Sequence, residues 1–341
     1  MRVAMYYNNH DVRLEERPVP RIGPGEMLVR VEACGICGSD VMEWYRLHRA
    51  PLVLGHELTG QVVEVGAGVE KYRVGDRVAC CHHVPCNTCH YCLSGHHTVC
   101  DTHRHTNFDP GGFAEYIRLL PIQVDHGTYL LPDDLSYEDG TFVEPLGCAL
   151  RGQRLARMQP GQSLLVVGSG IAGLLQIQSA RALGMGRIMA TDISDYRLEA
   201  ARRFGADATA RAEEAGPEWV RRVNVGRLAD VVALCTGAEP AIAQALASVE
   251  RGGTILFFAP TRPGVIVPVE MWNLWHNEVT VTTCYSASPS DATLALELIC
   301  HRRVPVQEMI THRLGLAEAG VGFGLVADAG ESIKVIIECQ R

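Results

Sequence analysis

The chain has 341 residues, of which 47% are hydrophobic and 21% are charged, and these values predict a globular protein of about two domains. The net charge of −8, without any basic run, argues against nucleic acid or an anionic membrane surface as the main partner. No stretch of about 18 apolar residues occurs, which argues against a membrane span. Because the first residues also lack the apolar core of a signal peptide, we expect a cytoplasmic protein.

The first part of the chain, residues 1–144, is expected to be β-rich and irregular. Alternating or apolar runs predict strands at residues 12–17, 26–34, 60–65 and 76–81. Glycine and proline clusters separate these runs and are typical of turns. The glycines at 66 and 68 resemble a phosphate-binding loop, but no helical pattern follows them, and we interpret them as a hairpin turn.

Thirteen cysteines occur in the chain, and most of them lie between Cys34 and Cys100. In a chain without an export signal, clustered cysteines are typical of reduced metal ligands. Four thiolates at short spacing can close a tetrahedral zinc site, which is structural because no coordination position stays open. Scattered buried thiols, an iron–sulfur cluster and a nucleic-acid-binding zinc finger are the alternatives, the last opposed by the acidic composition. The predicted structural zinc ligands are Cys86, Cys89, Cys92 and Cys100.

A second group of candidate ligands combines Cys37, His56 and Glu144, which lie far apart in the sequence. One thiolate, one imidazole and one carboxylate make a plausible open zinc site, in which water or substrate takes the remaining position. The spacing alone is moderate support, because a lone cysteine is usually part of a core and histidine beside glutamate is common by chance.

From residue 145 to 284 the pattern changes to apolar strands that alternate with helices. The segment 164–192 reads as strand, glycine-rich turn, helix and strand, followed by Asp192. Its turn, Gly168-Ser169-Gly170-Ile171-Ala172-Gly173, matches the dinucleotide-binding pattern G-x-G-x-x-G. Further strands are expected at 230–236, 254–259 and 278–284, then a helix at 290–301 and a strand at 333–339. This alternation predicts a doubly wound parallel sheet that binds a dinucleotide, rather than a glycine-rich turn without a ligand.

The ordered motifs resemble those of the zinc-dependent medium-chain alcohol dehydrogenase superfamily, in particular its sorbitol and threonine dehydrogenase branch. They are CGICGSD at 34–40, GHE at 55–57, VGDRV at 74–78, the four-cysteine loop at 86–100, GGFAEY at 111–116, EPL at 144–146 and GSGIAG at 168–173. The resemblance implies an α/β fold with a β-rich, irregular, barrel-like catalytic domain and a Rossmann domain. It places the catalytic domain at residues 1–144 and 285–341 and the NAD-binding domain at 145–284.

The resemblance also implies roles for the residues of the second group. Cys37 and His56 become direct ligands of a catalytic zinc ion, and Glu57 either ligates it or stands close behind it. Glu144 supplies a further ligand, directly or through water, with Cys148 as a competitor. Two zinc ions per chain, one catalytic and one structural, are therefore expected.

Near these ligands, Ser39 is expected to relay the alcohol proton, and a turn-capping serine is the alternative. Asp40 is expected to accept a hydrogen bond from His56 and to fix its tautomer. Many relatives carry a histidine where this chain has Met42, so the route by which the proton leaves is open.

The cofactor is expected to be NAD, because a carboxylate at Asp192 accepts hydrogen bonds from ribose hydroxyls and repels a 2′-phosphate. Arg197 could instead receive such a phosphate, which keeps NADP as an alternative. By family position Cys284 and Tyr285 also line the cofactor, although ordinary packing at a strand end would explain them equally. The glycine-rich turn contributes Gly168, Gly170, Ala172 and Gly173.

The predicted function is that of a zinc-dependent oxidoreductase that transfers a hydride between a secondary alcohol and NAD. The alcohol is a polyol, a sugar-derived alcohol or a hydroxy amino acid, and the protein is a homodimer or homotetramer. One alternative is an NADP-linked alcohol dehydrogenase or aldehyde reductase, and another is a non-catalytic nucleotide-binding or redox-sensing protein.

Several remaining residues have simpler interpretations. Because adjacent residues of an extended chain point to opposite sides, we predict no metal site at Cys80, Cys81, His82 and His83 and interpret them as strand and loop residues that lead to the structural zinc site. His103 and His105 are predicted to lie on the surface, and Trp272 and Trp275 to serve packing or subunit contact.

Overall fold

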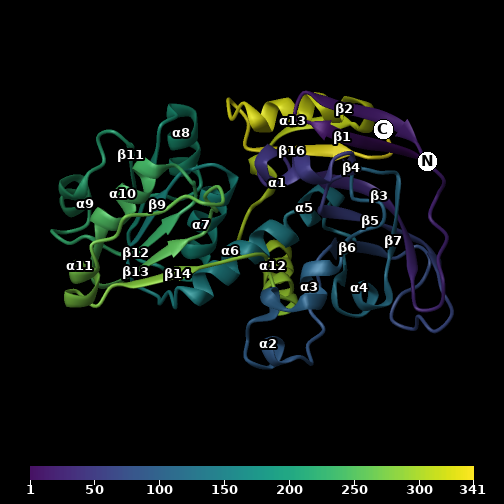
Figure 1. The fold of residues 1–341 in the computed structure, drawn as a ribbon, viewed down its shortest axis with the longest axis horizontal. Helices are drawn as coiled ribbons and strands as arrows, with labels where there is room; N and C mark the ends of the chain where they lie inside the picture. Colours follow the sequence, from purple (N-terminus) through teal and green to yellow (C-terminus); the bar gives the residue numbers. More distant parts are fainter. The chain divides into compact units, whose positions relative to one another are not determined.

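The computed structural model describes residues 1–341, which divide into two compact units (Figure 1). The first unit contains Met1–Gly147 and Ala287–Arg341, and the second contains Cys148–Ser286. The chain passes from the first to the second within one helix, α6 (Val143–Leu155). The predicted domain boundaries, after residues 144 and 284, lie close to these divisions.

The first unit is built on two sheets with mostly antiparallel pairing. A small sheet has the order β2-β1-β4, with β1 at Arg2–Asn8, β2 at Asp11–Glu16 and β4 at Leu52–Val53. In the larger sheet the order is β15-β16-β3-β5-β6-β8, and β7 pairs separately with β3. Its strands are β3 (Met27–Gly35), β5 (Glu57–Val65), β6 (Arg77–Cys81), β7 (Tyr116–Leu119), β8 (Thr128–Leu130), β15 (Ile310–Gly315) and β16 (Lys334–Glu338).

Strand β16 shows why the end of the chain belongs to the first unit. Its apolar residues are buried, and Ile337 lies opposite Cys34 on β3 in antiparallel register. The strand expected at 333–339 therefore returns to the β-rich unit, next to the segment that carries Cys37 (Figure 1).

Most helices of the first unit are short, and α12 is the longest of those that lie wholly within it. They are α1 (Glu43–Arg46), α2 (His90–Leu93), α3 (Asp101–His105), α4 (Pro121–His126), α5 (Tyr137–Gly140), α12 (Pro289–Cys300) and α13 (Ala319–Ala327). Four 3₁₀ turns accompany them: η1 (Leu47–Arg49), η2 (His97–Val99), η3 (Gln307–Met309) and η4 (Leu316–Glu318).

The second unit is a parallel sheet in the order β11-β10-β9-β12-β13-β14. Its strands are β9 (Leu164–Val167), β10 (Ile188–Asp192), β11 (Ala208–Arg211), β12 (Ala229–Leu234), β13 (Val249–Phe257) and β14 (Thr280–Thr283). Between them run α7 (Ile171–Ala182), α8 (Asp195–Arg203), α9 (Pro217–Val223), α10 (Glu239–Ser248) and α11 (Met271–His276). The predicted fold class is thus confirmed, although β13 begins several residues before the expected start at 254.

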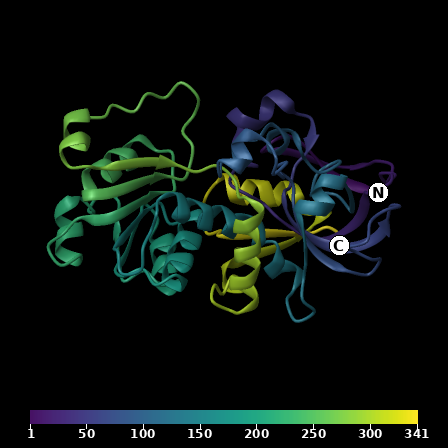
Figure 2. The ribbon, with the colours of Figure 1, turned by 90° about the horizontal axis from the view of Figure 1, so that it is seen from below.

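Burial follows the sheets. In the second unit the central strand β9 is buried at every residue, as expected for a parallel strand covered on both faces. The edge strand β14 is largely exposed, and α11 has no buried residue. The segment between β13 and α11 forms a long loop without helix or strand (Figure 2). None of the helices in the structure combines the length and the apolar character that crossing a bilayer requires.

Candidate metal centres and cofactor loop

Antiparallel pairing of β3 and β5 builds the first candidate metal centre. Gly35 at the end of β3 lies opposite Glu57 at the start of β5. Cys37 follows the first strand by two residues and His56 precedes the second by one, so the pairing brings them to the same edge. The possible ligand atoms of Cys37, His56 and Glu57 lie within 4.8 Å of one another.

Asp40 orients the histidine of this centre. Its carboxylate is fully buried, with Oδ1 at 3.3 Å from His56 Nδ1, while Oδ2 accepts a hydrogen bond of 3.1 Å from the Cys37 backbone nitrogen. Burial by itself raises the pKa of Asp40, but the neighbouring His56 and Arg46 outweigh it and lower that pKa. A carboxylate beside Nδ1 leaves Nε2 of His56 available for a metal ion.

Glu57 is held by a cation that the sequence analysis did not identify. Lys334 on β16 forms an ion pair with Glu57 Oε2, and both side chains are buried. The ammonium group also lies 3.4 Å from the Ile36 carbonyl oxygen. Although burial lowers the pKa of Lys334, the Glu57 charge outweighs it and the net shift is upward. A lysine inside the apolar run IKVIIEC was the available sequence signal, since a buried lysine requires a carboxylate.

Glu144 occupies the first turn of α6 and is 8% exposed. It does not join the group of three whose ligand atoms lie within 4.8 Å of one another, and neither does Cys148. Ligation by Glu144, directly or through water, therefore stays a prediction.

The four predicted structural ligands come together in the loop around α2. The sulfur–sulfur distances are 3.6 Å for Cys89–Cys92, 3.6 Å for Cys86–Cys100 and 4.0 Å for Cys86–Cys92. A tetrahedral ion with Zn–S bonds of about 2.3 Å requires sulfur–sulfur distances of about 3.8 Å. The arrangement therefore fits a closed zinc site.

Backbone groups prepare this loop for metal thiolates. The Cys89 backbone nitrogen donates a hydrogen bond of 3.3 Å to Cys86 Sγ. Hydrogen bonds from the backbone and side chain of Thr88, followed by that of Cys89, lower the pKa of Cys86 to about 5. A thiol with this pKa is a thiolate at neutral pH, which is the form that binds zinc.

The ring positions of His82 and His83 and the burial of His103 differ from the sequence-based predictions. His82 and His83 follow the end of β6, where the chain is no longer extended, and their rings lie 3.7 Å apart. The prediction that they point to opposite sides is therefore wrong. The His82 ring also lies 4.7 Å from that of His56. His103 is fully buried, which corrects the prediction of a surface position, whereas His105 is exposed as expected.

In the second unit, the turn after β9 has the geometry of a phosphate-binding loop. Gly168 has φ of 93°, which favours glycine, and a Cβ at Gly173 would lie 2.0 Å from the Gly168 carbonyl oxygen. Gly170 has no Cβ to block a phosphate, and the nearest other atom to that position is Arg197 Nη1 at 3.9 Å. Ala172 lies in the first turn of α7.

Asp192 at the end of β10 ties the turn to the next strand. Its Oδ2 accepts a hydrogen bond of 2.7 Å from the Ser169 backbone nitrogen, and its Oδ1 accepts one of 2.9 Å from that of Ser194. The carboxylate is thus fixed beside the glycine-rich turn, where ribose hydroxyls are bound in dinucleotide sites. Cys284 and Tyr285 follow β14, and Tyr285 is 48% exposed.

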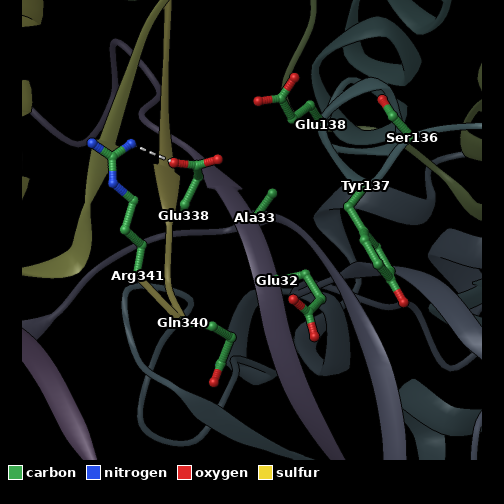
Figure 3. A pocket seen from close by; sticks show the side chains of 8 residues that line it. All are labelled: Glu32, Ala33, Ser136, Tyr137, Glu138, Glu338, Gln340 and Arg341. Atoms are coloured by element: carbon green, nitrogen blue, oxygen red, sulfur yellow. Dashed lines mark hydrogen bonds and ion pairs between the residues drawn. The ribbon is translucent and has the colours of Figure 1, made fainter.

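One pocket of about 430 Å³ lies elsewhere in the first unit (Figure 3). Its carboxylates are already paired with arginines: Glu338 lies 2.7 Å from Arg341 and Glu138 lies 2.6 Å from Arg313. It contains neither thiol nor imidazole, and we therefore place no metal site there. Its lining residues are Glu32, Ala33, Ser136, Tyr137, Glu138, Glu338, Gln340 and Arg341.

Comparison with family models supports this description. Residues 23–125 match the alcohol dehydrogenase GroES-like domain, and residues 172–300 match the zinc-binding dehydrogenase domain. A probable D-xylulose reductase A of Aspergillus clavatus is 34% identical, with 97% of this chain and 95% of the relative covered. The sorbitol dehydrogenase of Gallus gallus is 32% identical, with 97% and 94% covered.

Solved structures give the same result. A zinc-binding dehydrogenase from Sinorhizobium meliloti bound to NADP matches with a TM-score of 0.87, 27% identity and 99% of both chains covered. Galactitol-1-phosphate dehydrogenase from Escherichia coli matches with a TM-score of 0.87, 27% identity, and 99% and 100% covered. The chain therefore belongs to the zinc-dependent medium-chain alcohol dehydrogenase superfamily, in its sorbitol dehydrogenase-like branch, and is an alcohol dehydrogenase.

Proposed function

We propose that the protein oxidises a secondary alcohol of the polyol class with NAD, giving the ketone, NADH and a proton. The observation that carries this proposal is the convergence of Cys37, His56 and Glu57 within 4.8 Å, at a site that also holds Ser39 and Asp40. The relatives named D-xylulose reductase and sorbitol dehydrogenase support a polyol as substrate.

In this proposal, residues of the first unit bind the metal, transfer the proton and orient His56. Cys37, His56 and Glu57 would hold a zinc ion, with Glu144 as a further ligand directly or through water, and the ion would supply a Lewis acid that lowers the pKa of the alcohol. Ser39 would relay the alcohol proton by passing its own hydroxyl proton on, and a bound nicotinamide would take up the hydride. Asp40 keeps His56 in one tautomer, because it lies 3.3 Å from Nδ1.

The choice of NAD rests on Asp192. Both of its oxygens accept backbone hydrogen bonds, so the carboxylate is fixed where a 2′-phosphate would enter. Gly168, Gly170, Ala172 and Gly173 present the turn and the start of α7 to the pyrophosphate. Arg197 lies over this turn and is the feature that favours NADP as a second candidate. Cys284 and Tyr285 complete the proposed cofactor-binding residues.

We also propose that the protein is a homo-oligomer, at least a dimer, that forms through the second unit. Strand β14 ends the parallel sheet, and its Val281 is 45% exposed. On the adjoining α11, Trp272 and Trp275 are 64% and 69% exposed. An unpaired edge beside exposed tryptophans fits pairing with a second copy.

The reduced thiolates of both metal centres favour a reducing compartment such as the cytoplasm.

The function is tested by cofactor reduction with zinc-loaded protein, xylitol and sorbitol, and NAD or NADP. We expect turnover with kcat/KM at least about tenfold higher for NAD, since a carboxylate at this position disfavours the extra phosphate. Cys37→Ser should lower kcat about 1,000-fold or more, because several kcal/mol of stabilisation by the metal are lost. Cys300→Ser on α12 is the control and should keep wild-type turnover. Wild-type kcat in Cys37→Ser would overturn the mechanism.

A further inference from the structure

A basic segment borders the candidate catalytic centre. It consists of α1 and η1, residues 43–49, and contains Arg46, His48 and Arg49. Arg46 Nη2 donates a hydrogen bond of 3.1 Å to Ser39 Oγ, and Arg46 Nε donates one of 2.9 Å to the Ser39 carbonyl oxygen. The Ser39 backbone nitrogen in turn donates to Cys37 Sγ at 3.4 Å. One serine therefore separates a guanidinium group from a candidate zinc ligand.

Several contacts keep the Arg46 guanidinium in place. Nη2 lies 3.5 Å from Asp40 Oδ1, the group packs 4.7 Å from the centre of the Tyr45 ring, and the side chain is 14% exposed. Its remaining nitrogen, Nη1, donates to no protein group. A fixed guanidinium with a free N–H edge is preorganised for a carboxylate or phosphate oxygen.

A second guanidinium increases the positive charge at this position. Arg49 lies 5.8 Å from the same Tyr45 ring, and its Nε donates to His48 Nε2 at 3.2 Å. No carboxylate forms an ion pair with Arg49. The one carboxylate of the segment, Glu43, accepts a hydrogen bond from the Asn9 backbone nitrogen. Two arginines thus share one ring in a chain whose net charge is −8.

His82 and His83 are the histidines nearest the candidate catalytic centre and its arginines. Burial chiefly lowers the pKa of His83 to about 4, against the hydrogen bond with the Thr106 backbone, and the charges of His56, Arg46 and Arg49 contribute less. His82, whose ring contacts that of His56, has a buried Nδ1 without a hydrogen-bond partner. Buried polar atoms without a partner are rare in folded proteins, and a bound polar group is one way to satisfy them.

From this geometry we infer that the substrate carries an acidic group, a carboxylate or a phosphate, which Arg46 binds with support from Arg49. The inference rests on the proposed function, because the alcohol of the same substrate must reach Cys37, His56 and Glu57. A neutral polyol would leave the Nη1 edge without an ionic partner, whereas a sugar acid or a polyol phosphate would pair with it. The site would thereby select acidic derivatives of polyols over polyols themselves.

The test compares xylitol with D-xylonate and with xylitol 5-phosphate in the zinc-loaded protein with NAD. We expect kcat/KM for one acidic compound to exceed that for xylitol by about 10- to 100-fold, the value of one or two hydrogen bonds from a charged group. Which acidic compound is preferred distinguishes a carboxylate from a phosphate. Arg46→Met should lower the acidic-to-neutral ratio of kcat/KM by a similar factor, and Arg46→Lys should restore part of it.

The ratio is the decisive readout because damage to Ser39 would lower kcat for all three compounds alike. Arg13→Met is the matched control: Arg13 also pairs with an aspartate, at 2.6 Å, and packs 4.3 Å from a tyrosine ring, but it lies on β2. Equal or higher kcat/KM for xylitol in the wild type would overturn the inference and leave the proposed function intact.

Calorimetric titration separates the two proposals if no compound is turned over, an outcome that contradicts the proposed function. D-xylonate and xylitol 5-phosphate are then titrated into wild type, Arg46→Met and Arg13→Met. At least about tenfold weaker binding in Arg46→Met alone would support the acidic subsite, in line with the loss of a charged hydrogen bond. Equal affinities in the three proteins, or no binding to the wild type, would overturn it.

Discussion

Two lysines occur in this chain, one exposed to solvent and one buried. Lys71 is exposed and donates to the Asp125 carbonyl oxygen, whereas Lys334 is fully buried against Glu57. All other basic charges, apart from histidine and the N-terminus, are arginines. A lysine ammonium is compact enough to sit between strands β3, β5 and β16 and neutralise one carboxylate.

Replacing Lys334 by Met tests this pair. The substitution leaves the Glu57 carboxylate buried without its cation, and we expect the free energy of unfolding to fall by about 3–5 kcal/mol. Urea unfolding of the metal-free protein measures it, with Lys71→Met as the control, for which the change should stay below about 0.5 kcal/mol. If the free energy of unfolding falls no more in Lys334→Met than in Lys71→Met, Glu57 is neutral or solvated in the folded protein.

His83 gives a prediction about pH. Its pKa is lowered to about 4, chiefly by burial, so the folded protein holds it neutral while the unfolded chain protonates it near pH 6.5. The unfolded state therefore binds more protons between these values, and stability falls as the pH drops from about 6.5 to about 4.

His83→Gln should remove part of that dependence. Over this pH range we expect the free energy of unfolding to fall by about 3 kcal/mol less in the variant than in the wild type. Parallel urea titrations at several pH values provide the measurement, and His105→Gln, an exposed position on α3, serves as control. If the free energy of unfolding depends on pH in the same way in wild type and His83→Gln, His83 is not held neutral in the folded protein.

At the scale of elements, the loop around α2 and η2 depends on its ligands. The helical turns comprise only 4 and 3 residues, and few of their side chains are buried. Such short turns do not stabilise themselves, so we expect the metal to supply most of the folding free energy of this loop.

Cys92→Ser should therefore remove one zinc ion and loosen the loop. Metal analysis should give one zinc per chain instead of the two expected from the two ligand groups. Proteolysis should then cut between residues 86 and 105 faster than in wild type, because a loop without its ion opens more often. Cys300→Ser should keep both ions and the wild-type cleavage rate. Two zinc ions in Cys92→Ser would exclude Cys92 as a ligand.

At the scale of the whole molecule, the β14 edge of the parallel sheet lacks a partner strand. Strand β14 has a neighbour on one side only, and α11 exposes two tryptophans. Edges of this kind are normally protected by charges, by short length or by a second subunit. Here the strand Thr280–Thr283 is short, with 4 residues, but carries no charge.

Val281→Asp tests assembly through this edge. A carboxylate on the exposed face of β14 should repel its counterpart in a symmetric pair, and we expect sedimentation velocity at micromolar concentration to detect a monomer. Val74→Asp, in an exposed turn of the first unit, should leave the oligomer intact. A wild-type monomer would contradict the proposed assembly, and a Val281→Asp oligomer would place the interface elsewhere.

The sequence by itself determined the features that depend on local spacing. The four cysteines between 86 and 100 lie close in the chain, so their convergence needs only one loop, and the structure brings them together. The G-x-G-x-x-G turn and Asp192 belong to one strand–turn–helix–strand unit, whose parallel pairing follows from its pattern. The α/β class was predictable for the same reason.

Tertiary structure alone decided the contacts that join distant segments. Lys334 meets Glu57 because β16 pairs with β3 and β3 pairs with β5, and nothing local encodes this register. Two local contacts also depended on where elements begin and end: Arg46 reaches Ser39 because residues 43–46 form a helical turn, and the rings of His82 and His83 meet because β6 ends at Cys81. Side-chain directions at a strand end depend on where the ladder of hydrogen bonds stops, which the whole sheet determines.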